Sequence, residues 1–115
     1  MGRRVRYHGD FRADLRAQLK WLVANRPVAW IDSLKTAIDE AVELLSRFPS
    51  VGTIEATEGD MAVRRLILRK VPYVVWFLSD TAHPAADVWM LRLFHARQDR
   101  PPARIPERLG TRRQR

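Results

Sequence analysis

The stretch that most constrains the fold is Tyr73–Ser79, a run of β-branched and aromatic residues with almost no polar side chain. Successive side chains of a β-strand point to opposite faces, so this strand presents apolar groups on both faces. The two faces receive the alternating sets Tyr73, Val75, Phe77 and Val74, Trp76, Leu78. A strand of this kind lies in the centre of a sheet, and each of its faces requires a cover.

Two further β-rich runs, Val63–Arg69 and Val88–Phe94, flank this central strand in the sequence. The connection Lys70-Val71-Pro72 is short enough for a hairpin, while residues 80–87 indicate a longer loop. We therefore predict an antiparallel meander of three strands. Alternation in the first strand places Leu66 and Leu68 opposite Arg65, Ile67 and Arg69. In the third strand it places Trp89, Leu91 and Leu93 opposite Met90, Arg92 and Phe94.

The N-terminal half predicts a short edge strand followed by a helical hairpin. Residues 3–7 form the candidate strand, and Asp10 is a plausible N-cap for a helix over Phe11–Ala24, whose apolar face is Phe11, Leu15, Leu19, Leu22 and Val23. A second helix over Val28–Arg47 carries a 3-4-3-4-3 stripe made of Ile31, Leu34, Ile38, Ala41, Leu45 and Phe48. Residues 53–61 are predicted to be an acidic connection. The fold class is α+β, with the hairpin packed on one face of the meander.

The hairpin covers one face of the central strand, and no other segment is an obvious cover for the second face. We therefore expect an exposed apolar strip on that face, and its neighbours include Arg65, Arg69 and Arg92. Exposed apolar patches of this kind mark binding sites for partners.

Length and charge limit the classes of protein to consider. The 115 residues fit one domain over 1–100, followed by a basic tail over 101–115 that we expect to be flexible. The net charge of +8 arises from residues 62–100 and from the tail, which favours an acidic partner. No stretch has the length and apolarity of a membrane span, and the chain has no cysteine. We expect a cytoplasmic protein that needs no cofactor.

The order of these elements resembles the RelE/ParE superfamily of bacterial toxin–antitoxin toxins. The second helix ends in Leu-x-x-x-Pro-x-x-Gly (Leu45, Pro49, Gly52), a strand opens on Arg-Arg-Leu, and the next opens on Pro-Tyr. The last strand closes on His-Ala-Arg-Gln-Asp (His95–Asp99). The resemblance covers about residues 3–100. It implies a toxin that is neutralised by a cognate antitoxin, whose acidic amphipathic segment wraps the hairpin and the sheet.

The superfamily has two main activities. RelE-like members cleave mRNA on the ribosome, and ParE-like members bind and stall DNA gyrase. Arg97 lies where a RelE-like catalytic arginine is found, but Val74 replaces the arginine that usually follows the central tyrosine, and a C-terminal tyrosine is missing. The His-x-Arg-x-Asp ending is more usual in ParE-like chains. The resemblance therefore favours a gyrase inhibitor over a ribonuclease.

Candidate site residues follow from both hypotheses. A ribonuclease would use Arg69, Arg92, His95 and Arg97. The candidates for contact with the antitoxin or the target are Arg65, Ile67, Arg69, Tyr73, Trp76, Met90, Arg92, Phe94 and Arg97. His95 is either a general acid or base or a structural residue that bonds the backbone at a strand end. No two histidines have the spacing of metal ligands, so we expect no metal site.

Two tryptophans and the function each allow a further interpretation. Trp21 and Trp30 lie off the main apolar stripes of their helices, so they either flank the core or mark a second contact surface. A third hypothesis for the function is a non-toxic domain of the same fold that binds nucleic acid or acts as an adaptor. Steep salt dependence in the binding of bare DNA or RNA would favour that hypothesis.

Overall fold

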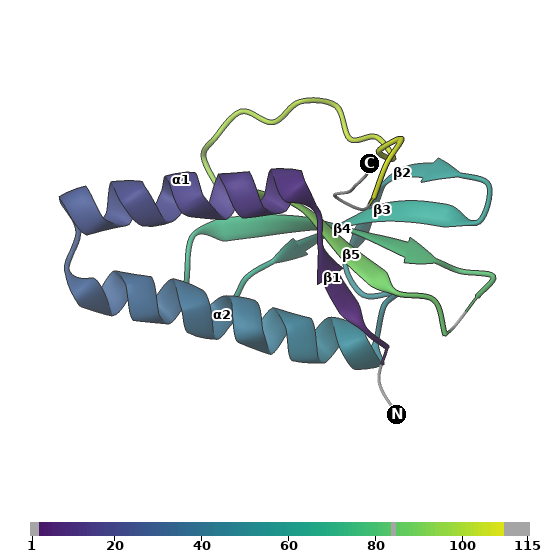
Figure 1. The fold of residues 1–115 in the computed structure, drawn as a ribbon, viewed down its shortest axis with the longest axis horizontal. Helices are drawn as coiled ribbons and strands as arrows, with labels where there is room; N and C mark the ends of the chain where they lie inside the picture. The colour runs from purple at the N-terminus through teal and green to yellow at the C-terminus, as the bar shows by residue number, and fades with distance from the viewer. Residues whose placement is uncertain (1–2, 84, 110–115) are drawn as a thin grey trace, which may run out of the picture.

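The computed structural model describes residues 3–83 and 85–109, which form two helices and one sheet. The elements in chain order are β1 (Val5–Tyr7), α1 (Gly9–Asn25), α2 (Val28–Arg47), β2 (Thr53–Glu58), β3 (Met61–Ile67), β4 (Tyr73–Asp80) and β5 (Val88–His95). The described residues give a sheet of five strands in the order β1-β5-β4-β3-β2 (Figure 1). β1 runs parallel to β5, and the other neighbouring strands are antiparallel. β4 is the central strand, as the sequence predicts.

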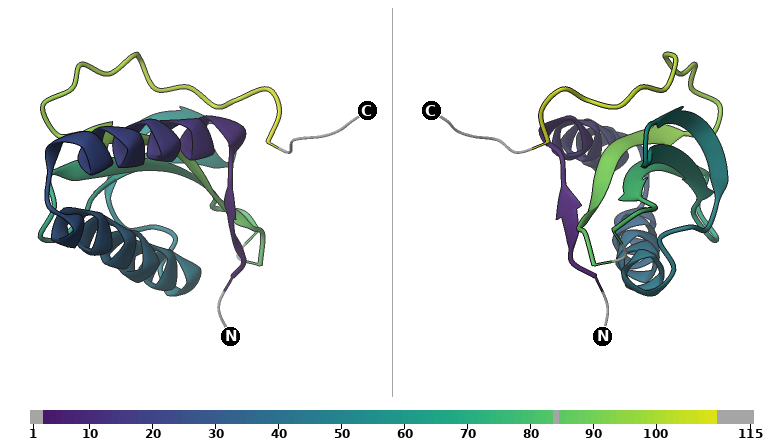
Figure 2. Two further views of the ribbon diagram at one scale, coloured as in Figure 1. Left: turned by 60° about the vertical axis from the view of Figure 1, so that its left-hand side comes forward. Right: turned by 90° about the vertical axis from the view of Figure 1, so that its right-hand side faces the viewer.

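The helical hairpin covers one face of the sheet and forms the larger core with it (Figure 2). The stripe of α2 supplies Leu34, Ile38 and Leu45, and these pack with the β4 side chains on the face of Tyr73, Val75 and Phe77. Burial of each large aliphatic side chain in this core stabilises the fold by about 1.5–3 kcal/mol before entropy is counted. The fold class and the bounds of α2 are as predicted.

The expectation of an uncovered second face is wrong. The apolar cluster on that face is Val63, Val74, Trp76, Leu78, Leu91 and Phe94, and Ala103, Ile105 and Leu109 of the C-terminal segment pack against it. This segment leaves the end of β5 and crosses back over the molecule without forming a helix or strand (Figures 1 and 2). His8 Nε2 lies 2.9 Å from the carbonyl oxygen of Arg108 and ties the segment to the start of α1. Residues 110–115 of the predicted tail lie outside the described residues.

A β-bulge changes the predicted orientation of side chains along β5. Trp76 pairs with Arg92 and Phe77 pairs with Met90, so Leu91 has no partner on β4. Because the extra residue shifts the alternation by one position, Met90 joins Leu93 on the helix-covered face. Trp89, Leu91 and Phe94 lie on the second face. Strict alternation assigned Met90 and Leu93 to opposite faces and was therefore wrong for this strand.

Two other local predictions require correction. β2 occupies most of the segment predicted to be an acidic connection; it is a short, exposed edge strand whose pairing comes from β3, which its own composition does not indicate. The N-cap of α1 is His8 and not Asp10, because His8 Nδ1 accepts the backbone N–H of Asp10 at 3.0 Å.

The apolar stripes are also shorter than predicted. Val23 and Phe48 are exposed, so neither contributes to the core that the rest of its stripe forms.

Gly52, the last residue of the Leu-x-x-x-Pro-x-x-Gly motif, gives a test of the turn between α2 and β2. Its φ is +85°, and a Cβ atom at this position would clash with the carbonyl oxygen of Arg65. We expect Gly52→Ala to lower the free energy of unfolding by about 1–3 kcal/mol in denaturant titrations. Gly59→Ala is the matched control, because φ is +59° there but no atom lies within 4 Å of the added Cβ. Equal losses in both variants would contradict the steric explanation.

Ile105 gives a test of the cover on the second face. Ile105→Asp places a carboxylate against the cluster around Trp76, so we expect the free energy of unfolding to fall by about 1–2 kcal/mol. Arg104→Ser changes an exposed neighbour and is expected to alter that free energy by less than about 0.5 kcal/mol. Wild-type stability of Ile105→Asp would show that the segment does not stabilise the sheet.

Candidate functional site

The structure separates the predicted site residues into buried and accessible groups. Tyr73, Trp76, Met90 and Phe94 are buried within the chain, so they do not form the exposed strip that the sequence predicts. The C-terminal segment packs against the cluster that contains Trp76 and Phe94. The β-bulge turns Met90 to the helix-covered face, and the helical hairpin covers Tyr73 on that face. The accessible or half-buried members are Arg65, Ile67, Arg69, Arg92, His95 and Arg97.

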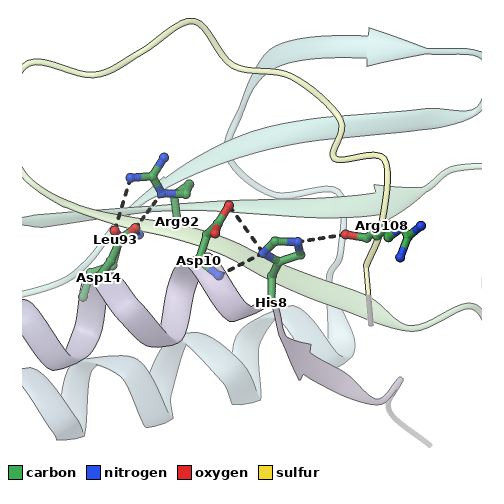
Figure 3. Close-up of polar contacts among 6 residues, drawn as sticks. All are labelled: His8, Asp10, Asp14, Arg92, Leu93 and Arg108. Atoms are coloured by element: carbon green, nitrogen blue, oxygen red, sulfur yellow. Dashed lines mark hydrogen bonds and ion pairs between the residues drawn. The ribbon is translucent and has the colours of Figure 1, made fainter. Parts of the chain in front are cut away.

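Arg92 already has a partner in the folded chain. Its Nε donates to one carboxylate oxygen of Asp14 at 2.7 Å, and a terminal guanidinium nitrogen donates to the other oxygen at 3.2 Å (Figure 3). The backbone N–H of Leu93 also donates to Asp14, at 2.9 Å. The hydrogen bond to Asp14 raises the pKa of Arg92 above its ordinary value, so the guanidinium remains charged. This contact fastens α1 to β5 and engages two nitrogens of the guanidinium with a carboxylate of the chain itself.

Asp14→Ala tests this structural role. The substitution leaves a half-buried guanidinium and the Leu93 N–H without their acceptor, so we expect unfolding to require about 2–3 kcal/mol less free energy. Glu43→Ala removes an exposed ion pair with Arg47 and is expected to change that free energy by less than about 0.5 kcal/mol. Similar stability of the two variants in denaturant titrations would refute the assignment.

The accessible residues near the end of β5 line a cavity at the end of the helical hairpin. The cavity has a volume of about 350 Å³ and lies between the facing ends of α1 and α2, the start of β4 and the end of β5. Its lining residues are Trp21, Leu22, Arg26, Trp30, Pro72, Tyr73, His95 and Arg97. Three of them, Tyr73, His95 and Arg97, are among the predicted site residues, and the fold brings these three together.

Tyr73 and His95 form the inner wall of this cavity and are held by the chain itself. The hydroxyl of Tyr73 donates to the side-chain oxygen of Gln18 at 3.1 Å, and burial raises the pKa of Tyr73 above its ordinary value. The rings of Tyr73 and His95 meet edge to face, with centroids 5.4 Å apart. His95 Nδ1 accepts the backbone N–H of Arg97 at 3.2 Å, which is the backbone contact that one of the two hypotheses for His95 predicts.

The outer wall contains residues that the sequence did not assign to a site. The guanidinium carbon of Arg26 lies 4.9 Å from the ring centroid of Trp21 and 5.4 Å from that of Trp30. The two tryptophans are 48% and 44% exposed, although they are large and apolar. Their position off the apolar stripes of the helices indicated a possible contact surface. That they flank Arg26 is evident only from the antiparallel hairpin.

Within residues 3–83 and 85–109, no group of three His, Asp or Glu side chains has an arrangement that could hold a metal ion. No helix in the same part of the chain is long and apolar enough to cross a membrane.

Comparison with solved structures defines the class of this fold. The structure resembles the chromosomal ParDE toxin–antitoxin system from P. aeruginosa, with a TM-score of 0.58 and 19% sequence identity over 81% of this chain and 95% of that one. It also resembles the archaeal RelE–RelB complex from Pyrococcus horikoshii, with a TM-score of 0.53 and 20% identity over 86% and 100% of the two chains. The helical hairpin on a mixed sheet is thus the RelE/ParE fold.

A family model for the ParE toxin of the type II toxin–antitoxin system parDE matches residues 5–100. The chain therefore belongs to the ParE toxin family, and it is a toxin of the type II toxin–antitoxin class. A comparison of the sequence with curated proteins gave no match. The resemblance that the sequence motifs indicated is confirmed.

Proposed function

We propose that this toxin acts by binding DNA gyrase and stalling it, and that a cognate antitoxin neutralises it in the cytoplasm. The pairing of Arg92 with Asp14 is the observation that favours a binding mechanism. A ribonuclease would need this guanidinium beside the RNA phosphate. The guanidinium of Arg92 donates two hydrogen bonds to Asp14, which also accepts from Leu93. Membership of the ParE family supports the same choice of target.

The other groups of a hypothetical ribonuclease site also favour the binding mechanism. Cleavage of RNA requires a base for the 2′-hydroxyl and a cluster of cations around the phosphate. The Nδ1 atom of His95 already accepts a hydrogen bond from the backbone N–H of Arg97. Tyr73 is buried, and its raised pKa disfavours the phenolate that a base would require. Neither residue has the arrangement of an activated general base.

For the antitoxin we propose a contact surface around Ile67. This side chain is 67% exposed, and Arg65 precedes it by two residues on the same face of β3. Ile67 pairs with Val74 and Arg65 pairs with Trp76, so both side chains lie on the second face of the sheet. Arg69 is exposed in the turn that follows β3. An acidic amphipathic segment would place an apolar side chain on Ile67 and carboxylates on the two arginines. At Arg65 it would compete with Glu55, whose carboxylate lies 3.7 Å from the Arg65 Nε.

Controlled expression of the toxin without antitoxin tests the target. We expect growth arrest with double-strand DNA breaks and an SOS response, because a stalled gyrase leaves cleaved DNA. Purified toxin should also inhibit DNA supercoiling by gyrase. Codon-positioned cuts in mRNA, without DNA breaks, would contradict the proposal and favour a ribonuclease.

A second experiment tests the antitoxin surface. The variant Arg65→Glu/Arg69→Glu should bind a purified cognate antitoxin at least about tenfold more weakly in calorimetric titrations, because like charges then face each other. Arg16→Glu/Lys20→Glu makes the same change in net charge on exposed positions of α1 and should bind with nearly wild-type affinity. Equal loss of affinity in both variants would show a general effect of charge and not a local surface.

A further inference from the structure

The end of the helical hairpin concentrates exposed apolar side chains to an unusual degree. Among the described residues eight large apolar side chains are exposed, and four of them lie within residues 21–30. These four are Trp21, Val23, Val28 and Trp30. Clusters of exposed apolar side chains mark contact surfaces in folded proteins.

The charge of this region is of one sign. Between Lys20 and Ile31 the charged residues are Lys20 and Arg26, and Arg97 closes the cavity from the end of β5. Within residues 3–83 and 85–109, neither Arg26 nor Arg97 forms an ion pair with a carboxylate. The cavity therefore combines apolar walls with two guanidinium groups that have no counter-charge, which suits an acidic segment bearing an apolar side chain.

The stacking of Arg26 favours a protein segment over a nucleic acid. Bases bind to exposed tryptophans by stacking on their rings. Here the guanidinium of Arg26 already lies over the rings of both Trp21 and Trp30. One terminal nitrogen of this guanidinium donates to the carbonyl oxygen of Asn25 at 2.9 Å. The other N–H groups along the edge of a stacked guanidinium are matched to a carboxylate.

We propose that this cavity is the site at which the toxin holds its target, and that the occupant is one apolar side chain from an acidic surface segment of that enzyme. This proposal rests on the proposed function, because it takes gyrase to be the target. A volume of about 350 Å³ lies at the lower end of the range for ligand pockets and suits a single large side chain. Tryptophan, tyrosine and arginine are also the residues that contribute most to binding energy in protein interfaces.

The geometry separates this site from the surface proposed for the antitoxin. Leu22 and Tyr73 of the cavity belong to the core on the helix-covered face, whereas Ile67 lies on the opposite face of the sheet. We therefore assign the cavity to the target and the surface around Ile67 to the antitoxin.

The test uses full-length Arg26→Glu and Trp30→Ala toxins in a gyrase supercoiling assay with purified enzyme. Each variant should inhibit at least roughly tenfold more weakly than the wild type, because interface anchors of these residue types carry most of the binding energy. Lys35→Glu and Leu44→Ala make matched changes on exposed positions of α2 away from the cavity and should inhibit like the wild type. Unchanged thermal unfolding and unchanged affinity for the antitoxin are also expected for both cavity variants.

Three results would overturn the proposal, and they are distinguishable. Inhibition by the cavity variants at the wild-type level would show that the target binds elsewhere, while the proposed function would stand. A parallel loss of antitoxin affinity would show that the antitoxin uses the cavity. Failure of the wild-type toxin itself to inhibit gyrase would instead reject the proposed function, and with it this assignment of the occupant.

Discussion

The structure depends on the need to cover β4 on both faces. This strand has a continuous apolar sequence, and all its residues from Tyr73 to Ser79 are buried. The helical hairpin covers one face with the larger core, and Ala103, Ile105 and Leu109 cover part of the other. Because the chain supplies both covers itself, the exposed large apolar side chains lie at the periphery, and they include those of the hairpin end and Ile67 at the end of β3. The two proposed contact surfaces lie there.

The contact between Asp14 and β5 links this architecture to function. One carboxylate accepts hydrogen bonds from the guanidinium of Arg92 and from the backbone of Leu93, and it thereby joins α1 to the sheet. The same contact occupies two N–H groups of Arg92, an arginine that looks catalytic in the sequence. This structural contact is the observation on which the proposed binding mechanism rests.

Much of the fold could be predicted because local patterns agree with the tertiary structure. The stripe of α2, the two apolar faces of β4 and the hairpin between β3 and β4 all depend on short-range periodicity. Three features could not be predicted, because they depend on distant partners: the strand β2, the bulge at Leu91 and the seating of Ile105 on the sheet. The candidate site was not predicted for the same reason. Arg26 lies over Trp21 and Trp30 only because the helical hairpin brings the two helices together.

Hydrogen–deuterium exchange of the toxin, alone and bound to gyrase or to its antitoxin, tests the separation of the two surfaces most directly. Gyrase should slow exchange at the hairpin end, residues 25–30, and at residues 96–98, and it should leave the turn after Ile67 unchanged. The antitoxin should give the reverse pattern. Protection of the same residues by both partners, or protection of neither region by gyrase, would contradict the account.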